Sequence, residues 1–218
     1  MRPLWDNAMD EIRIITIDRE YGSGAGDIAA ELATRLGWNL WDQRLTDEIA
    51  FLLDCERRAV EEREEHRDPA MYRLFKSFLR GSFEGTINMP RLRMVDADCV
   101  RDATQTIVKE VGERGNCVIV GRGGAYYLGA RRDAFHVFVY ALFDDKVRRI
   151  QATGKTEKEA IALIEQVDVD RASFIQQYFH VDWPERQRFH LMVNSSMGEQ
   201  VVVETIVDAM TTLAQHRA

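Results

Sequence analysis

Residues 14–36 read IITIDREYGSGAGDIAAELATRL, and this stretch decides the fold. Its first four residues are all β-branched, which predicts a strand buried on both faces at the middle of a parallel sheet. Three glycines in five residues follow, and apolar residues at helical spacing then run from Ala25 to Leu36. Glycine-rich backbone can approach an anion closely, and the first turn of a helix adds the positive end of its dipole. The stretch therefore predicts a phosphate-binding loop between a central strand and a helix.

Two known nucleotide-binding loops fit this stretch incompletely. The P-loop pattern G-x-x-x-x-G-K-[ST] would place a lysine and a hydroxyl where the chain has Asp27 and Ile28. The dinucleotide pattern G-x-G-x-x-G wants an acidic residue about 20 positions on, which Asp42 loosely provides, but Asp27 replaces its third glycine. Residues 19–21 separate the strand from the glycines. That longer loop can wrap around a phosphate, so it favours the P-loop interpretation.

Strand and helix patterns alternate along the rest of the chain. We expect further strands at 38–41, 117–121, 136–141 and 191–194, and helices at 96–114, from 144, from 156 to 178 and at 202–213. This alternation predicts an α/β fold of the P-loop NTPase type, with three α/β/α layers and a mainly parallel five-stranded sheet. A single domain would span residues 1–218, with a helical insert at about 54–95 and a lid-like helical region at about 152–185.

The expected insert contains two contrasting segments. Residues 54–68 are crowded with charge, which is typical of a solvated helix. Residues 71–83 instead carry an apolar stripe that could pack in the core, form a homodimer face or line one side of a lid.

Composition narrows the classes of function. The net charge of -7 argues against wrapping nucleic acid or docking on an anionic membrane. The chain has 24 arginines and 5 lysines, with no lysine before Lys76, so phosphate contacts would fall to arginine. Three scattered cysteines and five scattered histidines give neither a disulfide framework nor metal-ligand spacing. No apolar run is long enough to span a bilayer, so we expect a reduced, cytoplasmic protein.

Charged residues recur where ligands bind in open α/β sheets, near the carboxyl ends of strands. Asp42 follows the second expected strand, although a turn or cap residue has the same appearance. Arg122 follows the third strand among glycines and is the hardest to explain as structural. Farther along stand the pair Arg148 and Arg149, which could face solvent, and Asp168 with Arg171, one helical turn apart, which could form a surface pair worth about 0.3 kcal/mol.

Taken in order, these motifs resemble those of the cytidylate kinases. The closer likeness is to the cytidylate kinase-like proteins, a bacterial branch whose loop reads Arg-Glu-Tyr/Phe-Gly-Ser-Gly and lacks the usual lysine. The matching segments are REYGSG at 19–24, VIVGRGG at 118–124, Arg148-Arg149, Asp168-x-x-Arg171, Asp182-Trp183 and FHLMVNSS at 189–196. The resemblance covers most of the chain from Arg13 to Met210 and is weak across residues 54–96.

The resemblance implies a kinase that transfers a phosphoryl group from ATP, with Mg²⁺, to a nucleoside monophosphate such as CMP. Its implied donor-binding residues are Arg19, Tyr21, Gly22, Ser23, Gly24, Ala25, Gly26 and Asp27. Its implied catalytic arginines are Arg122, Arg149 and Arg171. The implied acceptor-binding residues are Asp42, Arg44, Arg122, Arg148 and Asp168, and no protein metal ligand is implied.

The loop leaves its own chemistry open. A carboxylate at Asp27 facing a bound phosphate would cost about 4 kcal/mol at 4 Å and an effective dielectric of 20, so Asp27 must point away or help to hold magnesium. Arg19 could replace the missing lysine or pair with Glu20. Besides the kinase, a catalytically silent nucleotide-binding module and a nicotinamide-dependent oxidoreductase stay open as alternatives.

Overall fold

The computed structural model describes residues 12–42, 44–45 and 97–217. Within these residues, five strands form one sheet in the order β2-β3-β1-β4-β5, and every neighbouring pair is parallel. The strands are β1 (Ile14–Arg19), β2 (Asn39–Trp41), β3 (Cys117–Val120), β4 (Ala134–Tyr140) and β5 (Leu191–Asn194). The β-branched strand β1 lies at the centre, as its sequence predicts.

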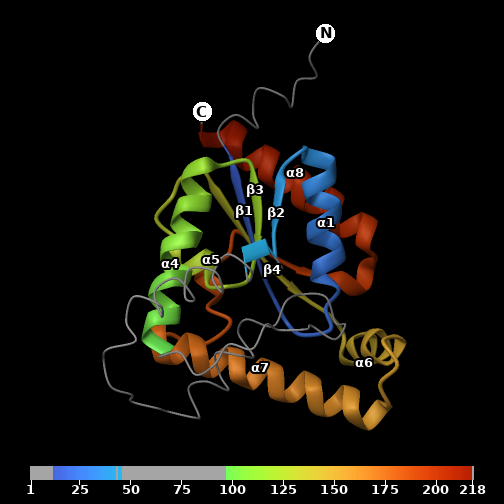
Figure 1. Ribbon diagram of the computed structural model, residues 1–218. Helices are drawn as coiled ribbons and strands as arrows, with labels where there is room; N and C mark the ends of the chain where they lie inside the picture. Colours follow the sequence, from blue (N-terminus) through green and yellow to red (C-terminus); the bar gives the residue numbers. More distant parts are fainter. Residues whose placement is uncertain (1–11, 43, 46–96, 218) are drawn as a thin grey trace, which may run out of the picture.

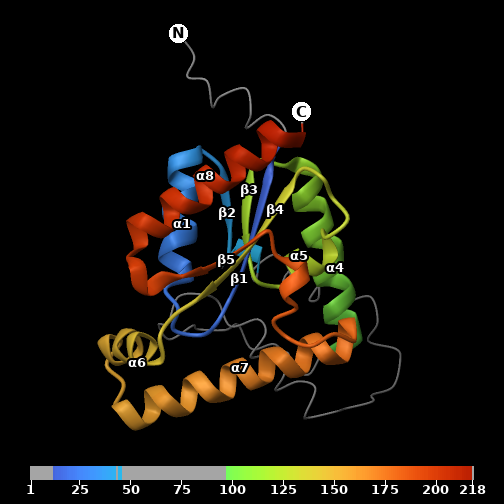
Figure 2. The ribbon, with the colours of Figure 1, turned by 180° about the vertical axis from the view of Figure 1, so that it is seen from behind.

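Helices cover both faces of this sheet (Figures 1 and 2). On one face, α1 (Ala25–Leu36) and α8 (Glu199–Arg217) bury Ile15 and Ile17 of β1. On the other face, α4 (Ala97–Arg114) packs against Ile14, and the short helix α5 (Gly124–Tyr127) follows β3. Successive strand residues thus alternate between two cores, and the predicted three-layer α/β/α architecture is confirmed.

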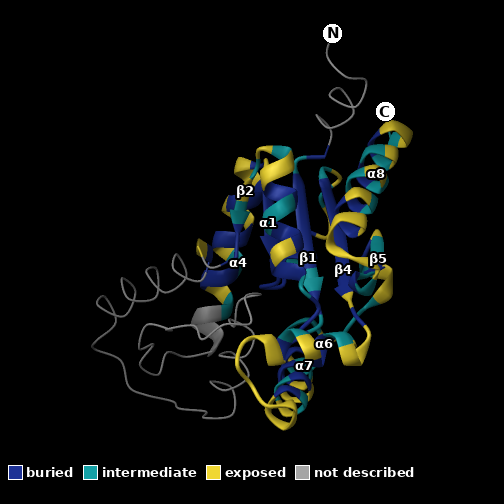
Figure 3. Ribbon diagram, turned by 90° about the vertical axis from the view of Figure 1, so that its right-hand side faces the viewer, coloured by how far each residue is buried: buried dark blue, intermediate teal, exposed yellow. Residues whose placement is uncertain are grey.

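Two helices lie at the carboxyl ends of the strands. The first is α6 (Phe143–Ala152), and the second is α7 (Glu157–Phe179), which crosses beneath the sheet in Figure 1. At the start of α7, Thr156 and Glu159 form the predicted capping box. Near its end, Phe174 joins the core under α4. The outer surfaces of α6 and α7 are exposed, whereas the strands are buried (Figure 3).

Some boundaries differ from the sequence prediction. Strand β4 begins at Ala134, two residues earlier than expected, and α8 extends from Glu199 to Arg217. Helix α5 was not expected, because four residues are too short to show a helical period. Two 3₁₀ turns, η1 (Arg186–Arg188) and η2 (Ser195–Met197), flank β5. The expected insert at 54–95 and its apolar stripe lie outside the described residues.

Candidate functional site

The glycine loop presents unused backbone donors at the start of α1. The first hydrogen bond of this helix runs from Ile28 N–H to Gly24 O at 3.3 Å. The N–H groups of residues 24–27 therefore have no acceptor among the described residues, as at any open helix start. The side chain of Ser23 is buried there, and its Oγ also lacks a hydrogen-bond partner within the described chain. Unused donors and a helix dipole together make a site for an anion.

The carbonyl groups of the loop are held from the other side. Arg149 Nη1 donates to Gly22 O at 3.2 Å, and Ser195 Oγ donates to Ser23 O at 2.5 Å. Arg149 also donates to Ser195 Oγ and O, which joins the two supports. A trans peptide points its C=O and N–H in opposite directions, so the Gly24 N–H is directed away from Ser195. These contacts orient the loop amides toward the anion site.

Helices α6 and α7 anchor the beginning of the loop. The Tyr21 ring is buried in a small core with Val147, Ile150 and Ile164 of these helices. Its backbone N–H donates to Asp168 Oδ1 at 2.8 Å. Burial raises the pKa of Asp168, while Arg171 and this N–H act in the opposite direction. The loop is therefore fixed to the helices that lie over the carboxyl edge of the sheet.

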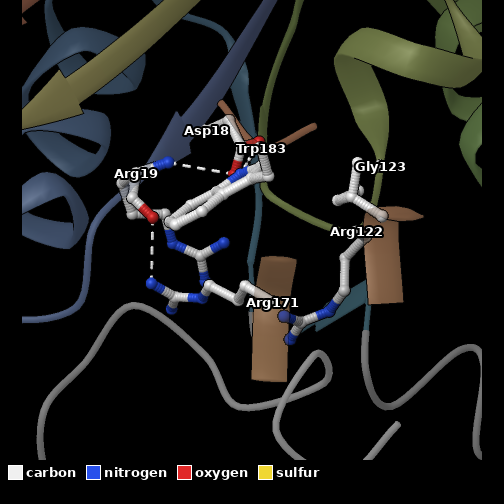
Figure 4. Close-up of a pocket in the computed structure, with 7 residues that line it drawn as sticks. Asp18, Arg19, Arg122, Gly123, Arg171 and Trp183 are labelled. Atoms are coloured by element: carbon white, nitrogen blue, oxygen red, sulfur yellow. Dashed lines mark hydrogen bonds between the residues drawn. The ribbon is translucent and has the colours of Figure 1, made fainter. Parts of the chain in front are cut away.

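Three arginines from separate elements converge beside the loop (Figure 4). Arg19 ends β1, Arg122 follows β3, and Arg171 lies on α7; all three line one small pocket. Arg171 Nη1 donates to Arg19 O at 2.9 Å, and its Nε is buried without a hydrogen-bond partner among the described residues. We call Arg19, Arg122 and Arg171 the arginine cluster. The Nε–H of Arg171 is thus available to donate to a ligand.

The backbone directs Arg122 into the interior. Gly121, Arg122 and Gly123 are all left-handed, with φ of 65°, 56° and 67°. This conformation is unfavourable for an arginine and typical of functional positions. The Arg122 side chain is 0% exposed, and its Nη2 lies 4.0 Å from Asp42 Oδ1. The turn therefore places a fully buried guanidinium at the ligand edge of the sheet.

Burial lowers the pKa of Arg19 and of Arg122, but both stay protonated at neutral pH. Burial, followed by the neighbouring Arg171, lowers the pKa of Arg19 to about 9, against the opposing effect of Asp42. Burial also lowers the pKa of Arg122 to about 10, where Asp42 again opposes it. Both guanidinium groups remain charged at neutral pH. Bringing such cations together in a desolvated pocket is unfavourable, and a bound anion relieves it.

Residues 14–197 match the sequence model of the cytidylate kinase-like family. The chain belongs to the cytidylate kinase-like family. The match runs from β1 to η2 and includes the glycine loop and the arginine cluster. A search of curated protein sequences gives no significant match.

Solved structures show that this member of the family has a P-loop kinase fold. A protein titled as uncharacterized, from Eubacterium ventriosum, superposes with a TM-score of 0.65 at 18% identity, covering 91% of this chain and 98% of the other. A gluconokinase from Sinorhizobium meliloti gives 0.53 at 14% identity, covering 94% of both chains. Shikimate kinase from Acinetobacter baumannii, in complex with shikimate, gives 0.50 at 14% identity, covering 94% and 97%.

Three residues implied by the family resemblance lie away from the pocket or on the surface. The Arg148 side chain is 74% exposed and pairs with Asp145 on its own helix. Arg44 is exposed and stacks on Trp41, with its Cζ 4.4 Å from the ring centre. The Asp27 side chain faces solvent, as expected if it is to avoid a bound phosphate. The remaining implied residues form either the loop with its supports or the arginine cluster with Asp42.

Three residues of the site have no role assigned from the sequence, although two of them, Trp183 and Ser195, lie in segments that carry the family resemblance. Lys146 of α6 packs against Gly22, and Ser195 supports the loop from the end of β5. Trp183 lines the pocket, and its Nε1 donates to Asp18 Oδ2 at 3.0 Å. Lys146 and Ser195 both come after strands, at the carboxyl edge of the sheet where ligands bind. This position in the sequence is the signal that could have identified them. Glu20 pairs with Lys146 at 3.0 Å.

The described residues fit an anion better than a protein-bound metal. The site has several hydrogen-bond donors without an acceptor among the described residues. They are Ser23 Oγ, Arg171 Nε and the loop amides. At the position where a P-loop has its metal-binding hydroxyl, Ile28 is buried and its side chain has no oxygen. Within the described chain, no group of three or more His, Cys, Asp or Glu side chains could hold a metal ion.

Proposed function

We propose that this protein transfers a phosphoryl group from magnesium-bound ATP to a nucleoside monophosphate such as CMP. The observation that carries this proposal is the arginine cluster. It gathers positive charge from β1, the turn after β3 and α7 beside an anion-binding loop. Two adjoining anion sites at one sheet edge suit a donor and an acceptor that both carry phosphate.

The loop would bind the donor. Its amides at residues 24–27 and Ser23 Oγ can donate to the terminal phosphates of the nucleotide, with the α1 dipole favouring negative charge. Arg149 and Ser195 would keep these donors in place by holding the carbonyl groups behind them.

The arginine cluster would bind the acceptor phosphate and the group in transfer. Phosphoryl transfer needs little covalent help, so positioning and positive charge around the phosphoryl oxygens supply most of the catalysis. Arg122 and Arg171 are held by the backbone turn and by Arg19 O, so they need little rearrangement. An arginine finger that stabilises such a transition state contributes about 10³–10⁵ in rate in GTPases.

A panel of acceptors tests the proposal. The folded protein is incubated with ATP and Mg²⁺ and each nucleoside monophosphate in turn, and ADP and the phosphorylated product are measured. The neighbours named shikimate kinase and gluconokinase are named for other acceptors, so shikimate and gluconate belong in the panel. Product formed with CMP fastest supports the proposal, and no product with any nucleoside monophosphate contradicts it.

A catalytically silent nucleotide-binding module is the second candidate. Asp27 and Ile28 stand at the positions of the loop lysine and hydroxyl, and this observation favours it. It predicts saturable binding of ATP without turnover for any acceptor.

A reduced cytoplasmic setting and a homodimer through residues 71–83 also stay predictions, which fractionation and light scattering would test. A melting temperature raised by NAD but not by ATP would instead support the oxidoreductase.

A further inference from the structure

Lys146 is a buried lysine in direct contact with the glycine loop. Its side chain is 9% exposed, although it lies on α6 near the surface. A Cβ built on Gly22 would lie 3.0 Å from Lys146 Cβ, and Gly22 has a φ of 80°. Any side chain at position 22 would therefore push α6 away. Gly22 lets the stem of this lysine approach the loop.

Lys146 differs from the other lysines that the structure describes. Lys109, Lys155 and Lys158 are exposed on helices or turns. Burying an ammonium is costly unless it is paired, and buried ion pairs often give no net stability. This chain has 24 arginines and 5 lysines, and the residue at this buried position is a lysine. A compact ammonium on a flexible stem can do what a planar guanidinium cannot, because it can swing between partners.

Lys146 forms ion pairs with two carboxylates at the beginning of the loop, Glu20 and Asp168. Its Nζ lies 3.0 Å from Glu20 Oε2 and 3.8 Å from Asp168 Oδ2. Asp168 in turn accepts the N–H of Tyr21. The ammonium therefore stands between two carboxylates and the first residues of the loop. Without it, both carboxylates would repel an anion bound there.

Arg19, the candidate from the sequence, is placed elsewhere. Its guanidinium lies over Gly121 at the end of β3, where it belongs to the arginine cluster. Among the described residues, Lys146 is the lysine that touches the glycine loop.

We infer that Lys146 supplies from α6 the ammonium that the loop itself lacks, and that its Nζ binds the donor phosphates of the nucleotide. This inference rests on the proposed function, since it concerns the same donor site. On binding, Nζ moves from Glu20 toward the phosphates, while its stem stays against Gly22. Lys146 is then a phosphate-binding residue of the transfer reaction, supplied by a helix that follows β4.

Binding of inorganic tripolyphosphate, measured by calorimetry at low salt, tests this role apart from turnover. Lys146→Met should weaken binding at least tenfold, while Lys109→Met, which changes an exposed lysine of α4, should not. Glu20→Gln removes the competing carboxylate but keeps the ammonium, so it should bind tripolyphosphate as tightly as the wild type or more tightly. If Lys146 only tethered Glu20, both variants would weaken binding alike.

The outcomes separate the two proposals. Wild-type affinity in Lys146→Met, or equal weakening in Lys146→Met and Glu20→Gln, overturns the role of Lys146 and leaves the kinase proposal standing. If Lys146→Met does not fold, Glu20→Gln decides, because a tenfold weakening there overturns the inference. Failure of the wild-type protein to bind either tripolyphosphate or ATP would sink both proposals.

Discussion

The guanidinium of Arg19 fills the space that a side chain at Gly121 would need. Arg19 ends β1 and Gly121 directly follows the neighbouring parallel strand β3, so the arginine crosses over the bare backbone after β3. A Cβ at position 121 would overlap with Arg19 Nη1. The shape of the arginine cluster thus depends on a residue that has no side chain.

Gly121→Ala should therefore be more damaging than an ordinary glycine substitution. At a φ of 65°, alanine costs about 1–3 kcal/mol in backbone strain, and displacing Arg19 adds to it. Gly37→Ala is the matched control, since Gly37 has a φ of 66° with no atom near its Cβ position. Urea unfolding of both variants measures the difference. Equal losses would show that Arg19 moves aside without cost.

Arg122→Ala and Arg171→Ala should each lower kcat by at least tenfold with the best acceptor. Both guanidinium groups line the pocket and are held in place before any ligand arrives. Arg35→Ala removes an exposed arginine of α1 and serves as the control. Circular dichroism should first confirm that each variant is folded. Wild-type kcat in both cluster variants would place the transfer site elsewhere.

The adjacent residues Arg148 and Arg149 should behave differently. Arg149→Ala removes the donors to Gly22 O and Ser195, so the loop should lose order and the KM for ATP should rise several-fold. Arg148→Ala removes only an exposed pair with Asp145, so its KM should change less. Steady-state kinetics at fixed acceptor concentration measure both. A larger effect from Arg148 would mean that α6 turns when nucleotide binds.

Stability should fall between pH 6.5 and pH 4 because of His136. Burial, then the neighbouring His190 and Arg188, lowers the pKa of His136 to about 4. The unfolded chain takes up a proton at about pH 6.5 whereas the folded chain does not, so the free energy of unfolding decreases as the pH falls. The loss from this group approaches about 3 kcal/mol and ends below pH 4.

Replacing His136 should flatten this part of the profile. The ring nitrogen Nδ1 shares a hydrogen bond of 2.7 Å with Thr16 Oγ1, so His136→Gln keeps a polar partner for Thr16. Urea midpoints at pH 7 and pH 5 would be compared for both proteins. An unchanged difference between the two pH values would assign the acid sensitivity to other groups.

Local sequence patterns predicted the layers of the fold and part of the site. The β-branched run at Ile14 identified the central strand, because only a doubly buried strand tolerates such residues without interruption. The carboxyl ends of parallel strands meet at one edge, so Asp42 and Arg122 could be expected near each other. The pattern of Asp168 and Arg171 correctly gave one turn of helix and one shared face.

The contacts between elements could not be obtained in this way. No local pattern states that α6 would turn Lys146 toward Gly22 or that Arg19 would point toward β3. These contacts depend on how far each helix rotates on the sheet, which packing of the whole core decides. Arg148 and Arg149 show the same limit. Adjacent residues on a helix face different directions, and the sequence did not reveal which of them reaches the loop.

The indole of Trp183 gives the protein an optical reporter of its own. Its Nε1 donates to Asp18, one residue before Arg19 on the central strand. Its ring packs edge-on against Phe138, with 5.5 Å between the ring centroids. It also lines the pocket of the arginine cluster. Tryptophan emission responds to nearby charge and to the loss of a hydrogen bond. Titrating the protein with a phosphorylated acceptor should therefore change its fluorescence. Trp183→Phe should reduce that change, and Trp41→Phe would measure the share of Trp41, which precedes Asp42.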